Sequence, residues 1–176
     1  MTVDEFLDWS GRQEGQYELL RGEIYAMAPG NIQHARSKAA CWLALSTAIK
    51  RAGLPCEAFI DGPGVAIAEH SCYIPDVSVH CGERVSGEVR LVPNPVIVIE
   101  VLSPSTERLD KSGKLADYFG IAGIQHYVIV NLERRFVMHH WRGEAGLITT
   151  AILREGEVRL EPPGVTLAVA EMFGEG

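Results

Sequence analysis

Apolar residues recur along the chain with two periods, which predict a mixture of strands and helices. Apolar positions three or four residues apart indicate amphipathic helices, whereas alternating or continuously apolar β-branched runs are typical of strands. The predicted helices span 3–9, 31–51 and 111–122. The predicted strands are a hairpin within 17–25, one bent or two short strands within 59–67, strands at 77–79, 96–99, 126–131, 136–141, 148–153 and 158–160, and a last short piece near 165–173. This mixture predicts a mixed α/β fold with a central sheet flanked by helices.

Turn and cap residues place several of these boundaries. Arg21-Gly22 separates the two halves of the first hairpin. Asn31 is the expected N-cap of the second helix, and Gly53 follows its last turn. The run 96–99 is apolar at every position, so we expect a central strand that is buried on both faces.

Length and composition indicate a globular protein. The chain has 176 residues, with 47% hydrophobic and 22% charged residues, which predicts one domain over 1–176. No apolar run reaches the roughly 18 residues of a membrane span. The acidic N-terminus lacks the pattern of a secretion signal, so we expect a cytoplasmic protein that does not contact membranes.

The four cysteines, Cys41, Cys56, Cys72 and Cys81, lack the close spacing of a zinc site. In a cytoplasmic chain we expect them to be reduced and to fill small core positions. The net charge of −7 argues against a protein that coats nucleic acid, because such a protein needs a basic surface. It leaves room for a DNA enzyme whose few cations gather at one cleft.

Two carboxylates at predicted strand ends are the main candidates for chemistry. Glu100 ends the most hydrophobic strand, where an unpaired carboxylate would cost several kcal/mol. Asp76 follows Pro75 at the start of another strand. Carboxylates on adjacent strands can hold Mg²⁺ or Mn²⁺, which serves phosphodiester hydrolysis.

The lysine that would complete such a site is absent from the strand itself. Position 102, on the same face as Glu100, is Leu. On the following predicted helix, Lys114 lies at the edge of the apolar face and can extend its ammonium toward the carboxylates. Lys111 projects from the first turn of the same helix and is the alternative.

Several segments together carry a resemblance to a known family. They are YELLRGE at 17–23, His34, PDVSV at 75–79, PVIVIEVLSPST at 95–106, and then Asp110, Lys114, Tyr118, Gly123 and Tyr127. The chain resembles the Uma-type endonuclease family of the restriction-endonuclease-like, PD-(D/E)XK superfamily. The resemblance departs at 125–128, where the family commonly has an acid and Tyr-Trp and this chain has Gln-His-Tyr-Val.

The resemblance implies a restriction-endonuclease-like fold, a metal-dependent cut in DNA, and roles for four residues. Asp76 and Glu100 are the implied metal ligands, Lys114 is the implied catalytic lysine, and Glu18 is similar to an extra acid of the superfamily. The implied cofactor is Mg²⁺ or Mn²⁺ and the implied assembly is a homodimer. Two alternatives stay open: a catalytically silent nuclease fold that binds DNA or protein, and a structural domain in which Glu100 simply pairs with Lys114.

Other histidines have structural explanations. His34 lies near a helix N-terminus, where a structural hydrogen bond is expected, although a place in the cleft stays open. His139 and His140 are neighbours on a predicted strand, so they face opposite sides and cannot serve one metal.

Overall fold

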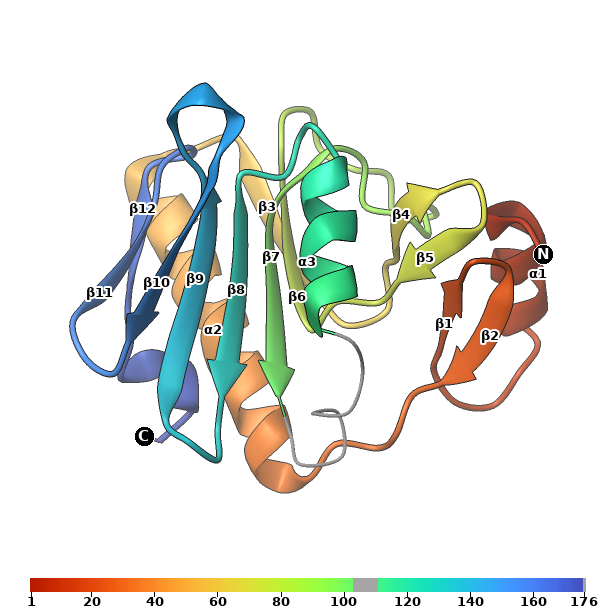
Figure 1. The fold of residues 1–176 in the computed structure, drawn as a ribbon, viewed down its shortest axis with the longest axis horizontal. Helices are drawn as coiled ribbons and strands as arrows, with labels where there is room; N and C mark the ends of the chain where they lie inside the picture. The colour runs from red at the N-terminus through yellow and green to blue at the C-terminus, as the bar shows by residue number, and fades with distance from the viewer. Residues whose placement is uncertain (103–110, 176) are drawn as a thin grey trace.

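The computed structural model describes residues 1–102 and 111–175 and has a six-stranded mixed sheet at its centre (Figure 1). The strand order is β10-β9-β8-β7-β6-β3. These strands are β3 (Cys56–Ile60), β6 (Val77–Cys81), β7 (Pro95–Leu102), β8 (His126–Asn131), β9 (Phe136–Arg142) and β10 (Ile148–Leu153). β7 and β8 run parallel, and the other neighbouring pairs are antiparallel. The expected mixed α/β architecture is confirmed.

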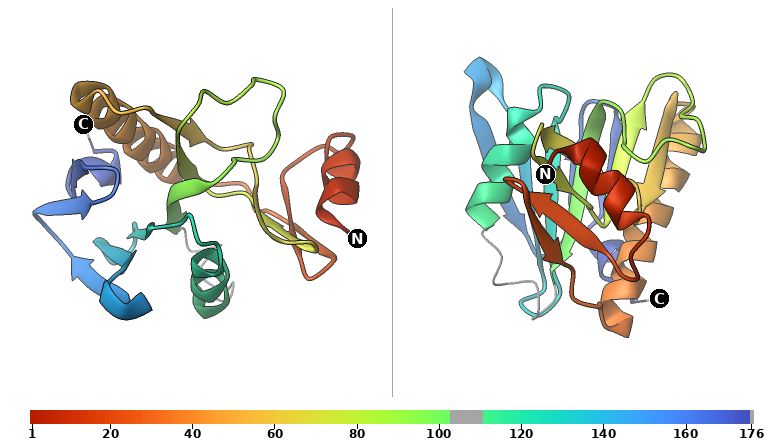
Figure 2. Two further views of the ribbon diagram at one scale, coloured as in Figure 1. Left: turned by 90° about the horizontal axis from the view of Figure 1, so that it is seen from above. Right: turned by 90° about the vertical axis from the view of Figure 1, so that its right-hand side faces the viewer.

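Helices cover both faces of this sheet (Figure 2). α2 (Ile32–Ala52) packs on one face together with the hairpin β11 (Glu157–Leu160) and β12 (Val165–Ala168) and the short helix η2 (Glu171–Phe173). α3 (Lys111–Gly120) packs on the other face and connects the parallel strands β7 and β8. A parallel pair needs such a crossover, because its second strand must restart at the opposite end of the sheet. A short helix, η1 (Glu144–Gly146), precedes β10.

A second sheet with the order β2-β1-β5-β4 lies beside the α3 face, with α1 (Val3–Ser10) packed against it (Figure 1). It contains β1 (Tyr17–Leu20), β2 (Glu23–Ala26), β4 (Val65–Ala68) and β5 (Ser71–Tyr73). The sequence pattern did not predict β5, since its three residues are too few to show a period. β1 of this sheet carries Glu18, one of the site residues that the resemblance implies.

Local signals in the sequence agree with the structure at α2. The Asn31 side chain accepts a hydrogen bond from the His34 amide, and Gly53 takes the left-handed conformation, φ 63°, at the C-cap. Within β7, Ile97, Ile99 and Val101 face the α2 core, whereas Val98 packs toward α3. The prediction of a central strand with two buried faces is therefore confirmed.

The prediction that all cysteines are reduced is wrong for one pair. Cys56 and Cys81 are joined by a disulfide. They lie directly opposite each other on the antiparallel strands β3 and β6, with their Cα atoms 3.9 Å apart. Cys41 and Cys72 are free and buried, as predicted. Sequence spacing could not reveal the pairing, because 25 positions separate the two residues along the chain.

Some expectations concern residues outside the described ranges. The strand end predicted at 103–106 and the motif residue Asp110 lie there, and so does the side chain of Lys111. Among the described residues, no helix is both long and apolar enough to cross a membrane.

Candidate active site

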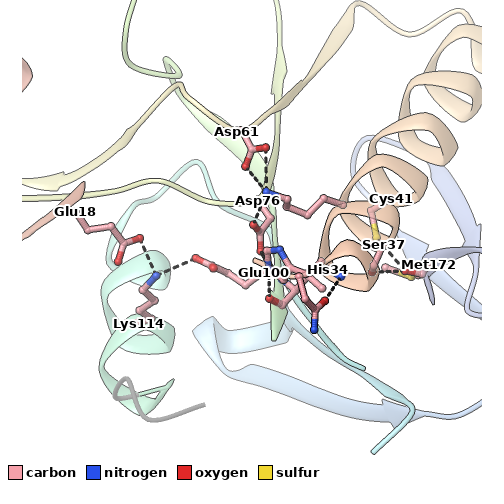
Figure 3. A network of polar contacts seen from close by, with 12 residues as sticks. Glu18, His34, Ser37, Cys41, Asp61, Asp76, Glu100, Lys114 and Met172 are labelled. Carbon is pink, nitrogen blue, oxygen red and sulfur yellow. Dashed lines mark hydrogen bonds and ion pairs between the residues drawn. The ribbon is translucent and has the colours of Figure 1, made fainter. Parts of the chain in front are cut away.

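Three carboxylates reach one cavity: Glu18 from β1, Glu100 from β7, and Asp76 from the position just before β6. Val77 of β6 pairs with Ile99 of β7, so the next position of this antiparallel register brings Asp76 beside the end of β7 that carries Glu100. The Asp76 Oδ2 atom accepts a hydrogen bond of 2.7 Å from the Val101 amide, which fixes this carboxylate against β7. Glu18 comes from β1 in the other sheet and accepts a hydrogen bond from the Ile74 amide. Figure 3 shows the three side chains converging.

Lys114 extends from α3 between two of these acids. Its Nζ donates to Glu18 Oε1 at 2.9 Å and to Glu100 Oε1 at 3.1 Å (Figure 3). Its ammonium also lies 4.7 Å from the centre of the Tyr73 ring, a cation–π distance. The geometry is consistent with the prediction that Lys114 takes the place of a lysine at position 102. The Leu102 side chain packs against the apolar cluster beneath α3, and the helix supplies the cation.

Glu100 lies in an environment that opposes its ionisation. Burial raises the pKa of Glu100 to about 7; Lys114 lowers it, whereas the charges of Asp76 and Glu18 raise it further. The Tyr118 hydroxyl donates to Glu100 Oε1 at 2.8 Å and favours the ionised form. The raised pKa means that Lys114 and Tyr118 together do not fully offset the effect of burial and of the two neighbouring acids.

The pKa of Lys114 is shifted in the opposite sense to the effect of burial. Burial alone would lower it, but the carboxylates of Glu100 and Glu18 raise it above its ordinary value. Lys114 therefore remains protonated at any physiological pH. It can donate hydrogen bonds and stabilise negative charge, but it cannot accept a proton as a base.

Sequence reasoning missed a second cation of the cavity, Lys38 of α2. Its Nζ donates to Asp61 Oδ1 at 2.8 Å and to Oδ2 at 3.0 Å, and lies 3.7 Å from Asp76 Oδ1. A lone lysine in an amphipathic helix gives no signal in the sequence. Only the packing of α2 against the sheet places it beside Asp76.

His34 combines the two roles that the sequence left open. Its Nε2 lies 2.9 Å from the Val101 carbonyl oxygen and 3.5 Å from Asp76 Oδ2, and its ring lines the cavity. The hydrogen bond to Asp76 raises the pKa of His34. A carbonyl oxygen only accepts, so Nε2 carries the hydrogen, and Nδ1 is buried without a partner among the described residues. Gly30 makes room for the ring, because a Cβ there would lie 2.5 Å from Nδ1.

These groups line one cavity of about 560 Å³. Its wall contains Glu18, Asp76, Glu100, Lys38, Lys114 and His34, and an apolar part comes from the segment 26–30 that joins β2 to α2. The volume lies within the range of ligand-binding pockets. His139 and His140 lie away from this cavity and have different partners, as expected for neighbours that face opposite sides of a strand. His139 contacts His126, whereas His140 contacts Thr150.

The donor set fits a divalent cation of the magnesium type. Within the described residues, no group of three or more His, Cys, Asp or Glu side chains is arranged to hold a metal ion. Mg²⁺ does not require such a cage, since it is commonly held by one or two carboxylates, with water and substrate phosphate completing its shell. Four carboxylates, those of Glu18, Asp61, Asp76 and Glu100, lie beside the two ammonium groups of Lys38 and Lys114, so acids outnumber lysines around the cavity. A divalent cation would offset this excess of acidic groups.

Over most of its length, the chain is similar to two proteins in sequence and to one solved structure in fold. It is 33% identical to the uncharacterized protein slr1290 of Synechocystis sp., over 98% of this chain and 91% of that protein. It is 26% identical to the uncharacterized protein sll1609 of the same organism, over 88% and 89%. A crystal structure from Anabaena variabilis, described as "a putative nuclease belonging to DUF820", matches with a TM-score of 0.78 and 19% identity, over 98% of this chain and 97% of that chain. The model of the Uma2 family, described as "putative restriction endonuclease", matches residues 3–170, and the chain belongs to this family.

Proposed function

We propose that this protein is a metal-dependent endonuclease that hydrolyses phosphodiester bonds in DNA. The observation that carries the proposal is the position of Lys114, held between Glu18 and Glu100 in the cavity that Asp76 also lines. Membership of the Uma2 family and the shared fold support a nuclease-like function.

Asp76 and Glu100 are the proposed ligands of Mg²⁺ or Mn²⁺. When bound, the ion would supply an activated water and neutralise charge on the reacting phosphate. Asp76 is held for this role by the Val101 amide. Glu100 must be ionised, so a bound cation is expected to lower its raised pKa.

Lys114 and Glu18 act as a pair in this proposal. The Lys114 ammonium donates to the attacking water or to a phosphate oxygen, and it stabilises the negative charge that develops there. Glu18 keeps that ammonium beside Glu100. In the reaction, the water oxygen bonds to phosphorus and releases a proton to solvent, the bond from phosphorus to the 3′ oxygen breaks, and the 3′ oxygen takes up a proton from solvent. By analogy with the superfamily, the product carries a 5′-phosphate.

The chain is proposed to act as one restriction-endonuclease-like domain, as a homodimer and in the cytoplasm. Dimers are common among soluble proteins, and two sites would address the two strands of a duplex. The alternative is a silent nuclease fold that binds DNA or protein. The net charge of −7 favours a protein partner over DNA in that case.

The test is nicking of supercoiled plasmid with Mn²⁺ or Mg²⁺. We expect the wild type to nick, and Asp76→Ala and Lys114→Met to lose most of the activity. Lys50→Met is the matched control, because Lys50 is exposed at the far end of α2. Equal nicking by the wild type and Asp76→Ala contradicts the assignment. Calorimetry with Mn²⁺ separates the alternative, since a silent module need not take up the ion.

A further inference from the structure

The two lysines of the cavity occupy equivalent positions on either side of the proposed metal ligands. Lys114 lies between Glu100 and Glu18, and Lys38 lies between Asp76 and Asp61. Each proposed ligand acid thus has an ammonium within 4 Å, from opposite faces of the sheet, and both lysines line the same cavity. The proposed chemistry uses Lys114 and leaves Lys38 unexplained.

A structural role does not account well for the Lys38–Asp61 pair. The Lys38 side chain is 15% exposed, whereas Asp61 is 38% exposed. An ion pair with one partner this accessible adds little to stability. The pair is therefore open to exchange of its partner.

The partner that fits is a phosphate. Asp61 presents two oxygens to the Lys38 ammonium, at 2.8 and 3.0 Å, as two oxygens of a phosphodiester would. Asp76 lies 3.7 Å away, beyond hydrogen-bond distance, so it attracts the ammonium without saturating it. A DNA strand that approaches this acidic cavity meets repulsion from four carboxylates, and one further cation in contact with it reduces that repulsion.

We propose that Lys38 is a substrate-binding residue that contacts a backbone phosphate next to the one that is cut, and that Asp61 occupies its ammonium until substrate arrives. The inference rests on the proposed function and extends it to the grip on DNA. It assigns Lys38 to binding and leaves the chemical step to the other side of the cavity. Removal of Asp61 is then expected to strengthen binding, although a residue is lost from the site.

The test compares Lys38→Met, Lys38→Arg and Asp61→Asn with the wild type, and Lys50→Met on the same helix is the control. Fluorescence anisotropy with a labelled DNA duplex, in metal-free buffer over a range of salt concentrations, gives the affinity and its salt dependence. Each phosphate contact adds about 0.9 to the slope of log affinity against log salt, which corresponds to about tenfold in affinity near 0.1 M salt. The KM for plasmid nicking with Mn²⁺ is the second readout.

We expect Lys38→Met to bind about tenfold more weakly, with a slope shallower by about 0.9. Lys38→Arg keeps its charge and should retain the slope. Asp61→Asn should bind more tightly, and Lys50→Met should match the wild type. KM should follow these affinities while kcat stays within a few-fold, and melting curves show whether each variant is folded.

Three results overturn different parts of the reasoning. If the wild type nicks DNA but Lys38→Met keeps its affinity, slope and KM, Lys38 is not a phosphate contact and the proposed function stands. If Asp61→Asn binds less tightly than the wild type, Asp61 does not compete with phosphate. If the wild type neither binds nor nicks DNA, the proposed function fails, and this inference fails with it.

Discussion

Replacement of Lys114 by Met tests the electrostatics of the site without any substrate. The change keeps most of the side-chain volume and removes the ammonium that contacts Glu18 and Glu100. Both acids then lose their cation in a nearly buried place, since their side chains are 8% and 13% exposed. Breaking a buried pair from one side costs about 3–5 kcal/mol.

The pH dependence of this loss follows from Glu100. Burial raises its pKa to about 7 from an ordinary 4.5, so the wild type loses stability as pH rises between these values and little beyond them. In the variant the ammonium no longer lowers this pKa, so the folded protein retains the proton to higher pH. Its stability therefore continues to fall, by about 1.4 kcal/mol per pH unit above 7. The difference in unfolding free energy between the wild type and Lys114→Met should therefore widen by this amount with each pH unit. This corresponds to a difference in Tm that grows by about 3–6 °C per pH unit.

Urea unfolding and melting curves between pH 6 and 9, in buffer that contains EDTA, measure the gap. Lys50→Met, an exposed change of the same kind, should give a small gap that does not vary with pH. A gap for Lys114→Met that stays constant from pH 6 to 9 would refute the reasoning. It would mean that Glu100 does not titrate near neutrality, or that Lys114 does not control its ionisation.

Three further changes test other parts of the structure. Gly30→Ala should lower stability by about 1–3 kcal/mol in urea unfolding, because its Cβ would lie 2.5 Å from His34 Nδ1, whereas Gly87→Ala, with no atom within 4 Å, should be nearly neutral. Cys56→Ser, which opens the disulfide between β3 and β6, should cost about 3 kcal/mol under non-reducing conditions and nothing once the wild type is reduced. Burial lowers the pKa of His139 to about 4 from 6.5, so the folded protein loses stability as pH falls between these values, and His139→Phe should shrink that acid loss in melting curves.

Local sequence signals were sufficient for most elements of the fold. Asn31 and Gly53 cap the two ends of α2, as predicted. The sequence shows such ends because a cap acts on the backbone within one helical turn. The all-apolar run of β7 identified the central strand for a similar reason, since burial on both faces leaves no polar position. β5 escaped notice because its pairing with β1 and β4, rather than its own three residues, makes it a strand.

The residues of the candidate site also fall into two groups: those that the sequence indicates and those that only the folded structure brings together. Glu100 stood out in the sequence because a carboxylate at the end of an apolar strand is costly, and that cost depends on neighbours along the chain. Asp76 was indicated by its place after Pro75 at the start of a strand. Lys38 and the pairing of Cys56 with Cys81 gave no such signal. Their partners are distant along the chain, and only the register of β3 with β6 and the packing of α2 bring them together.

The sequence by itself therefore determined the types of element, the core strand and the pair of acids, since each depends on periodicity or on a local cost of burial. The tertiary structure decided which cation serves which acid. It placed Lys114 between Glu18 and Glu100, 96 and 14 positions away along the chain, and Lys38 between Asp61 and Asp76. Electrostatic energy depends on distance in space and on the exclusion of water, and neither is set until sheet and helices pack.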